Sequence, residues 1–307
     1  ACTHARTHAR MRTHPPTHPP TQARARARTH THTHSAEDSG GSLAASDGSI
    51  ASLADSTITR CFAGHGGGVY VEQSKIVMRG MLFSQNAALV NKGGAALAHD
   101  NSEMNVTSTT VTDNVATRGG GFMVQFSSVL RLAGDVRIMK CVASSGGGGW
   151  GGAAYSLFDS TIDISGPFLV DDNMAWHFGG AFISYYSRRF VASGEGIFSN
   201  NAVGLGNPDR GYGGVLAWYG VGGTVEMYGV KMSNNIALIR GGALDFVDPG
   251  LVVFATGLIL DNNHALGLGD AMERGGGALF LGDGASIFLY RSILRNNSGN
   301  QGGGLIV

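Results

Sequence analysis

Residues 276–303 read GGALFLGDGASIFLYRSILRNNSGNQGG, and most of the chain after Ser39 consists of variations on this unit. The unit opens with two glycines, a small residue and a short apolar run, and continues with apolar residues at alternate positions, Ile287 and Leu289. Leu294 then stands three places before Asn297, and the glycine pair returns six residues later. A unit this short cannot bury its own apolar face, so it must stack on copies of itself.

Two columns of residues mark the copies of this unit. The first is the glycine pair, which recurs at intervals of 26 to 35 residues and begins at Gly40, Gly67, Gly93, Gly120, Gly151, Gly179, Gly213, Gly241, Gly276 and Gly303. The second is an asparagine, which stands at Asn86, Asn114, Asn173, Asn201, Asn235, Asn263 and Asn297. Cys61 and Cys141 take the asparagine slot in two further units, and the residue three places earlier is apolar in every unit.

The pattern within each unit predicts strands. Apolar and polar residues alternate by two, as in Ile162-Asp163-Ile164, and no helical period is present. We therefore predict an all-β fold over residues 39–307, a right-handed parallel β-helix of about nine coils. Stacked side-chain amides both donate and accept, so the seven asparagines should bond one another along the rod. Because Val307 falls inside a repeat, we expect the chain to be truncated at its C-terminal side.

Residues 1–38 form a separate low-complexity segment. Thr-His-Ala-Arg, Thr-His-Pro-Pro, Ala-Arg and Thr-His repeats follow one another here, as expected of translated simple-sequence DNA. Seven of the eleven histidines lie in this segment, but alternating Thr-His imposes no ligand geometry, so a metal-binding tract is the less favoured alternative. The segment has too little apolar content to fold, and we expect a disordered tail.

Composition excludes several classes of protein. Residues 1–34 hold six of the 22 basic side chains and no acidic one, so residues 35–307 carry a net charge of −6, which argues against a nucleic-acid partner. No apolar run approaches the ~20 residues of a transmembrane helix. Three cysteines do not form a disulfide framework, and the ligand spacings of metal sites and the loops of cofactor sites are absent. We expect neither a metal nor a cofactor.

Three insertions fall at one corner of the expected coil. The distance from the asparagine slot to the next glycine pair is six or seven residues in most coils, but 10 after Cys141, 12 after Asn201 and 13 after Asn263. Solenoids often place binding loops on one side, although exposed turns also tolerate insertions that have no function. The candidate binding residues in these insertions are Trp150, Asp209, Arg210, Tyr212, Asp270, Glu273 and Arg274.

A run of aromatic residues follows the glycine pair in successive coils: Phe158, Tyr185, Tyr186, Trp218, Tyr219 and Phe246. If these rings face outward, they form a platform suited to sugar rings, and Trp218 and Tyr219 therefore join the candidate binding residues. The alternative is ordinary packing inside the rod. The sequence leaves both open.

The two columns resemble the repeats of the polymorphic outer-membrane protein family, first known from chlamydiae. The family's Gly-Gly-Ala-apolar motif matches GGAF at 179–182 and GGAL at 241–244 and 276–279. Its Phe-x-x-Asn motif matches FSQN at 83–86 and FSNN at 198–201. The resemblance covers residues 40–307 and implies a right-handed β-helix passenger region that acts as a surface adhesin and is delivered through a C-terminal barrel.

Many β-helix proteins cleave polysaccharides, so catalytic groups must be considered. The best cluster is Asp171 and Asp172, and register places Asp113, Lys140 and Asp172 in three successive coils. A lyase or hydrolase needs clustered carboxylates, whereas alternating charge at this spacing is also what a solvated row of side chains shows. Glu273 and Arg274, together with Asp270, form a weaker second candidate.

The sequence favours a non-catalytic, adhesin-like protein, at the cell surface or secreted, that presents loops and aromatic rings to a glycan or a protein. Its alternative is a polysaccharide lyase or glycoside hydrolase of the β-helix type. The two differ in one respect: a catalytic rod concentrates three or more ionisable side chains in one groove, whereas a binding rod spreads them evenly.

Overall fold

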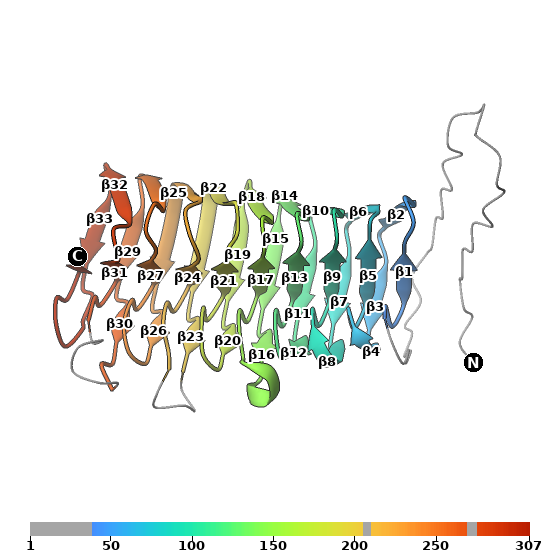
Figure 1. The fold of residues 1–307 in the computed structure, drawn as a ribbon, viewed down its shortest axis with the longest axis horizontal. Helices are drawn as coiled ribbons and strands as arrows, with labels where there is room; N and C mark the ends of the chain where they lie inside the picture. Colours follow the sequence, from blue (N-terminus) through green and yellow to red (C-terminus); the bar gives the residue numbers. More distant parts are fainter. Residues whose placement is uncertain (1–38, 205–209, 269–274) are drawn as a thin grey trace.

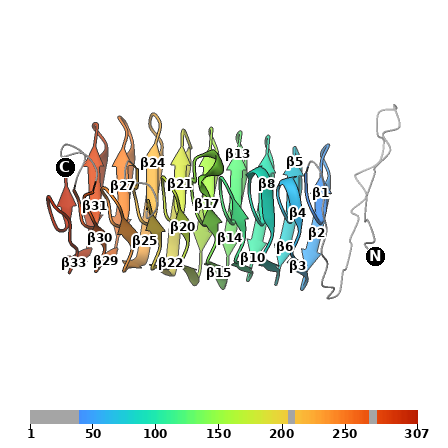
Figure 2. The same cartoon turned by 90° about the horizontal axis from the view of Figure 1, so that it is seen from below.

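The computed structural model describes residues 39–204, 210–268 and 275–307. In these residues the chain winds into a rod of about nine coils, in which every paired strand runs parallel to its equivalent in the next coil (Figure 1). The side view shows the successive coils stacked along the rod axis (Figure 2). The prediction of an all-β parallel β-helix is confirmed, while the expected tail, residues 1–38, lies outside the described residues.

Three sheets form the walls of the rod. The ten-stranded sheet contains β1 (Leu43–Ala45), β5 (Val69–Glu72), β9 (Ala96–His99), β13 (Phe122–Gln125), β17 (Ala154–Leu157), β21 (Phe182–Tyr185), β24 (Leu216–Tyr219), β27 (Leu244–Val247), β31 (Leu279–Gly282) and β34 (Leu305–Ile306). The eight-stranded sheet contains β4 (Phe62–His65), β8 (Ala87–Lys92), β12 (Val115–Ala116), β16 (Val142–Ala143), β20 (Met174–Ala175), β23 (Ala202–Val203), β26 (Ile236–Ala237) and β30 (His264–Ala265).

The sixteen-stranded sheet forms the third wall and has two strands from most coils. Its first strands are β2 (Ile50–Ala54), β6 (Lys75–Arg79), β10 (Glu103–Thr107), β14 (Val129–Ala133), β18 (Thr161–Ser165), β22 (Arg189–Ser199), β25 (Thr224–Ser233), β28 (Val252–Thr256) and β32 (Ser286–Tyr290). The others are β3 (Thr57–Thr59), β7 (Leu82–Ser84), β11 (Thr110–Thr112), β15 (Val136–Met139), β19 (Phe168–Asp171), β29 (Ile259–Asp261) and β33 (Ile293–Arg295). One short 3₁₀ helix, η1 (Ser145–Gly147), lies in the first insertion.

The apolar residues of the alternating pattern fill the interior. In β10, Met104 and Val106 are buried, whereas Glu103, Asn105 and Thr107 lie on the outer side. The apolar column ahead of the asparagine slot is buried in every coil from Ile58 to Leu260. Alternation by two is therefore enough to assign the inner and outer faces of these strands.

The asparagine column forms the predicted ladder inside the rod. The side-chain Nδ2 of Asn201 donates to Oδ1 of Asn235 at 3.0 Å, and Asn235 donates in the same way to Asn263 at 2.9 Å. Each amide also serves the backbone: Nδ2 of Asn235 donates to the carbonyl of Phe198, and the backbone N–H of Asn201 donates to Oδ1 of Asn235. The ladder thus satisfies buried turn groups that no water reaches.

Cys141 interrupts this ladder. Nδ2 of Asn114 approaches its sulfur at 3.9 Å, and the thiol is fully buried, which raises its pKa to about 12. We expect Cys141→Asn to raise the free energy of unfolding by about 1 kcal/mol, because the new amide accepts from Asn114 and donates to Asn173 and Val111. Urea denaturation of the two proteins measures the difference. An unchanged or lower stability would show that the slot is too tight for the amide.

The glycine pair turns the chain into the ten-stranded sheet. Gly241 has φ +63°, and a Cβ on Gly242 would overlap the carbonyl oxygen of Gly277 in the next coil. The first glycine is thus required because its φ is positive, and the second because the backbone of the next coil leaves no room for a side chain. In three of the runs of three glycines the turn begins one residue earlier than the sequence columns placed it, at Gly66, Gly119 and Gly302, whereas at 275–277 it begins at Gly276 as predicted.

Candidate binding face

The three insertions leave and rejoin the rod at one corner, as far as their described ends show. They start after equivalent alanine or valine positions of the eight-stranded sheet, at Ala143, Val203 and Ala265. They end within one row of parallel bridges that contains Trp150, Tyr212 and Gly275. Of the candidate residues in these insertions, Asp209, Asp270, Glu273 and Arg274 lie outside the described residues.

This row of bridges, which we name the corner row, lies along one edge of the ten-stranded sheet. Its cations and rings contact one another from coil to coil: Arg118 lies 4.9 Å from the Trp150 ring, Phe178 stacks on Tyr212 at 5.4 Å, and Arg240 lies 4.7 Å from Tyr212. Tyr212 is 8% exposed. The corner row consists of Ser39, His65, Lys92, Arg118, Trp150, Phe178, Tyr212, Arg240 and Gly275.

Beneath the corner row, the outer face of the ten-stranded sheet carries a second hydrophobic core. Its buried members are Leu97, Met123, Tyr155, Leu157, Ile183 and Ala217. The Trp150 ring packs against Tyr155 at 5.5 Å and against Tyr185 at 5.9 Å. Trp150 therefore covers this core, whereas Tyr212 packs in a separate cluster with Leu238 and Ile239, so both have a structural part beside any part in binding.

Tyr219 belongs to a polar cluster on the same face. Its hydroxyl donates to Asp245 at 2.7 Å, and Nε of Arg240 donates to the other carboxylate oxygen at 2.8 Å. Asp245 is fully buried although it points outward from its strand, because Arg240 lies over it and over the Phe280 ring at 4.3 Å. Burial, with Asp245 nearby, raises the pKa of Tyr219.

Two of the aromatic residues in the sequence run lie inside the rod. Trp218 and Phe246 are fully buried, and the indole N–H of Trp218 donates to the carbonyl of Gly222 at 3.2 Å. Trp218 is therefore not a surface residue, contrary to its place among the candidates. Arg210 is exposed, with its guanidinium 5.9 Å from the Phe178 ring.

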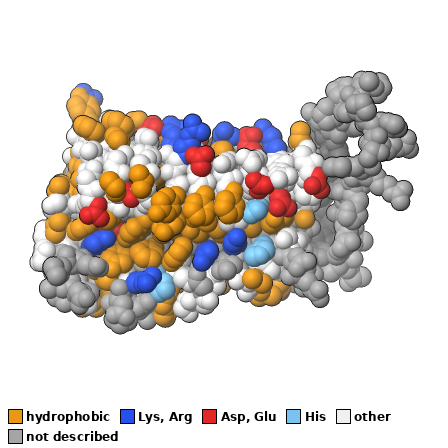
Figure 3. Space-filling model, in the orientation of Figure 1, with side chains coloured by type: hydrophobic (Ala, Val, Ile, Leu, Met, Phe, Trp, Pro, Cys, Tyr) orange, Lys and Arg blue, Asp and Glu red, His pale blue; other side chains and the backbone are white. Residues whose placement is uncertain are grey.

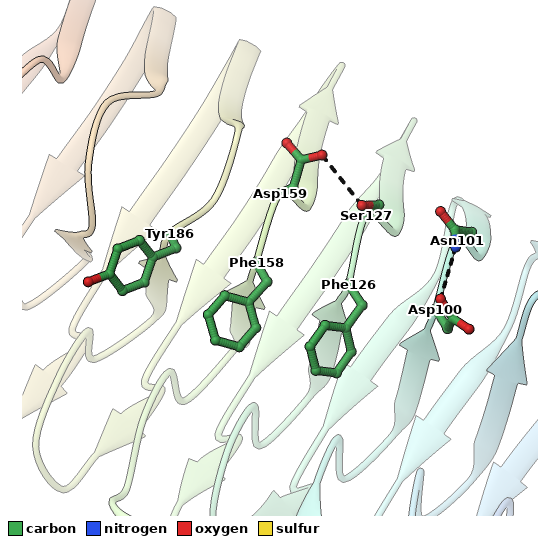
Figure 4. Close-up of a pocket in the computed structure, with 7 residues that line it drawn as sticks. All are labelled: Asp100, Asn101, Phe126, Ser127, Phe158, Asp159 and Tyr186. Carbon is green, nitrogen blue, oxygen red and sulfur yellow. Dashed lines mark hydrogen bonds between the residues drawn. The ribbon is translucent and has the colours of Figure 1, made fainter.

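Three other rings form an exposed row, which we name the aromatic ladder. Phe126, Phe158 and Tyr186 occupy the same position in three successive coils, immediately after β13, β17 and β21 (Figure 4). Phe126 stacks on Phe158 at 5.4 Å, and Phe158 on Tyr186 at 6.1 Å. They are 39%, 42% and 47% exposed, which is high for rings in contact with one another. Phe126 was missed in the sequence because it stands next to the polar Gln125, outside the run of aromatic residues.

The backbone holds these rings in an unusual conformation. Phe126, Phe158 and Tyr186 have φ values of +55°, +47° and +51°. Aromatic residues seldom adopt this left-handed conformation, which costs each of them ~1 kcal/mol or more. In other coils the corresponding residue is polar, as at Gln73, Asp100 and Asp283, or is glycine, as at Gly220.

A polar rim borders the aromatic ladder and completes an open depression of about 380 Å³. Asp100 accepts from Asn101 at 2.9 Å and from Gln73 at 2.6 Å, and Ser127 donates to Asp159 at 3.4 Å. The space-filling view shows an apolar strip along the middle of this face, with acidic and basic side chains beside it (Figure 3). The face combines exposed rings with carboxylate, amide and hydroxyl groups.

The catalytic candidates do not gather at a site. Asp113, Lys140 and Asp172 occupy equivalent turn positions in three coils, and all are exposed. Asp171 accepts hydrogen bonds from Ser199 and Asn200. Within the described part of the chain, no three His, Cys, Asp or Glu side chains gather as metal ligands, and no helix is long and apolar enough to span a membrane.

One buried carboxyl predicts a pH dependence of stability. Burial, with Asp283 nearby, raises the pKa of Asp248 to about 6. The folded protein then keeps this proton to a higher pH than the unfolded chain, whose aspartates titrate near pH ~3.9, so stability falls as the pH rises from about 4 to about 6. We expect Asp248→Asn to raise the melting temperature at pH 7 and to leave it unchanged near pH 4. An equal effect at both pH values would contradict this assignment.

Comparison of this chain with known proteins found no matching family model, no similar curated protein and no similar solved structure.

Proposed function

We propose that this β-helix repeat protein is a non-catalytic, adhesin-like binding protein, at a cell surface or secreted, that holds a glycan chain along the aromatic ladder. The observation that carries the proposal is the row of Phe126, Phe158 and Tyr186, stacked at coil spacing and exposed beside a polar rim. The surface location rests on the resemblance of the repeats to those of surface adhesins.

The chemistry of the face supports a sugar ligand. The apolar face of a sugar ring packs against aromatic side chains, while its hydroxyls donate to carboxylates and amides such as those of Asp100, Asn101 and Asp159. The parallel coils repeat every ~4.8 Å, close to the length of one pyranose unit in an extended chain. A linear polysaccharide can therefore place about one unit over each coil.

The charge of the rim favours a neutral glycan. In Figure 4, Asp159 lies beside the rings in one row with Ser127 and Asn101, and Asp100 lies at the end of the row of rings. Carboxylates accept from sugar hydroxyls but repel the carboxylates of uronic acids. The two carboxylates therefore favour a neutral over an acidic polysaccharide.

The unusual backbone of the ladder also supports a role in binding. A strained conformation is kept where it has a function, and the neighbouring coils show that polar residues fit the same turn. If the rings served stability alone, polar replacements would destabilise the rod. If they serve binding, polar replacements should leave the fold intact.

We expect Phe158→Asn to weaken binding of neutral polysaccharide at least ~10-fold, the loss typical of a central aromatic anchor. Stability should stay constant or rise by up to ~1 kcal/mol, because asparagine tolerates a positive φ. Affinity electrophoresis against neutral and acidic polysaccharides, with thermal melts of each protein, measures both effects. The matched control is Phe288→Thr, which removes an exposed ring from the outer face of β32.

Three results would count against the proposal. Binding by the wild-type protein to acidic polysaccharides alone would exclude the neutral ligand. Equal loss in Phe158→Asn and Phe288→Thr would show that the ladder has no special part. Release of new reducing ends or unsaturated products from the polysaccharide would favour the lyase or hydrolase alternative.

A further inference from the structure

The outer face of the sixteen-stranded sheet carries two ion-pair triads in successive coils. In the first, Glu103 pairs with Lys75 at 3.1 Å and with Arg131. In the second, Arg189 pairs with Asp163 at 3.3 Å and with Glu226 at 2.9 Å. The order along the rod is Lys75, Glu103, Arg131, Asp163, Arg189 and Glu226, so the sign of the charge alternates over six coils.

The two triads carry opposite net charge. The first has two cations and one carboxylate, and the second has two carboxylates and one cation. Arg131 in β14 and Asp163 in β18 are register neighbours where the triads meet. The part of the sheet face that carries the triads is therefore net positive on β6, β10 and β14 and net negative on β18, β22 and β25.

A surface of this kind is complementary to itself. In an isologous dimer, a two-fold axis that lies along the strands between β14 and β18 reverses the order of the coils and keeps the position along each strand. β14 then faces β18 of the second copy, and β10 faces its β22. Arg131 lies opposite Asp163 of the second copy, and Glu103 opposite Arg189, because each pair shares one position along the strand.

Exposed apolar residues flank the triads at matching distances from this axis. Ile50 in β2 and Phe254 in β28 are 52% and 43% exposed, and these two strands face each other in the dimer. Val77 in β6 and Tyr228 in β25, at 36% and 40%, form the next pair inward. Burial of these side chains would supply the apolar contact that exposed ion pairs alone do not.

The area of this face is sufficient for a stable dimer. Strands β2 to β28 of eight coils, ~4.8 Å apart and each of five residues of ~3.3 Å, cover on the order of 600 Å². Two such faces bury about 1,200 Å² in total, at the lower end of specific interfaces. Long-range attraction between the triads then assists association in the antiparallel orientation.

From this complementarity, we propose that two copies of this chain associate through the outer faces of their sixteen-stranded sheets, with the rods antiparallel. The aromatic ladder occupies the turns that join the ten-stranded and sixteen-stranded sheets. Its rings pack against His99 and Tyr185 of the ten-stranded sheet, so they stay accessible in such a dimer. The proposal is independent of the ligand of that ladder.

Charge reversal tests the proposal by sedimentation equilibrium. The wild type is expected to dimerise at about 50 mM salt and to weaken at about 500 mM, where exposed charges are screened. The dimer contains two symmetric contacts between residue 131 of one copy and residue 163 of the other. Arg131→Glu and Asp163→Arg should each raise the dimer Kd at least ~10-fold, because both contacts then join like charges. A 1:1 mixture of the two variants should dimerise again. In one contact of the mixed dimer, the two introduced side chains face each other and have opposite charge. In the other contact, the native Arg131 faces the native Asp163.

Controls separate the interface from general effects. Arg210→Glu reverses an exposed charge on another face and should dimerise like the wild type, as should Phe158→Asn. A wild type that is monomeric at low salt would overturn the proposal, as would a mixture that fails to restore association. If a charge-reversed variant shows a lowered melting temperature, the salt dependence of the wild-type dimer still decides.

Discussion

Asn235→Ala is expected to lower the free energy of unfolding by about 4 kcal/mol. The Oδ1 of this fully buried residue accepts from the backbone N–H and from Nδ2 of Asn201, and both hydrogen bonds are lost in the variant, which leaves that N–H unpaired and Nδ2 with Val170 alone. Its own Nδ2 donates to the carbonyl of Phe198 and to Oδ1 of Asn263, and both of these bonds are lost as well, although the backbone N–H of residue 235 still donates to Asn263. Each buried polar group left unpaired costs ~1–3 kcal/mol, which is why several losses together dominate the small volume change. Urea denaturation measures the difference.

The neighbouring asparagine supplies the matched control. Asn234 is exposed at the same turn with φ +57° and accepts from Asn262 at 2.7 Å. Asn234→Asp keeps the acceptor and tolerates this backbone conformation, so we expect a change within ~0.5 kcal/mol. A comparable loss in both variants would mean that the turn, rather than the buried ladder, limits stability.

Gly242→Ala is expected to destabilise the rod by on the order of 4 kcal/mol or to prevent stacking of the coils on either side. The new methyl group would overlap backbone atoms, the carbonyl of Gly277 and the amide of His264, which cannot rotate away as a side chain would. Thermal melts followed by circular dichroism measure the loss of parallel strand structure.

Gly222→Ala separates this steric effect from backbone conformation. Gly222 has φ +74° with no atom near its absent side chain, so only the cost of the left-handed conformation applies, ~1–2 kcal/mol. Similar melting temperatures for Gly222→Ala and Gly242→Ala would contradict the close-approach explanation.

The fold could be predicted from the sequence because stacking imposes the same demand on every coil. A buried turn needs an amide at one slot, so asparagine recurs there, and close coils need a glycine, so Gly-Gly recurs. The exact turn position could not be predicted where three glycines stand together, as at 66–68, because glycine fits every position of the turn equally well.

The candidate site was predicted only in part, because the side chains of a strand alternate between its two faces. Successive residues of a strand point to opposite faces, so of two adjacent aromatics Trp218 lies inside the rod and Tyr219 packs on the outer face of the sheet. A one-residue error in register exchanges the two. Phe158 and Tyr186 were in the sequence run, but their exposure follows from a turn conformation that aromatic residues rarely adopt, and no pattern of polarity reports it.

The cation and ring contacts of the corner row could not be predicted either. Arg118, Trp150 and Tyr212 directly precede glycine turns, where polarity alone indicates an exposed loop. The Trp150 ring folds back over the outer face of the ten-stranded sheet, Arg118 lies over that ring, and Tyr212 stacks on Phe178. Only the three-dimensional spacing of the coils brings these side chains together.

The equivalence of the coils has a consequence for how the gene can change. Each coil meets its neighbours through the same glycine and asparagine positions, so duplication or deletion of one whole unit leaves matching surfaces on both sides. Loss of residues 213–240, which span 28 positions, would bring β21 against β27 and place Asp248 beside Tyr186. Insertion of a copy of the Phe158 coil would instead lengthen the aromatic ladder by one ring. The length of the aromatic ladder, and with it the length of the proposed glycan ligand, can thus vary in whole steps during evolution, while the architecture stays constant.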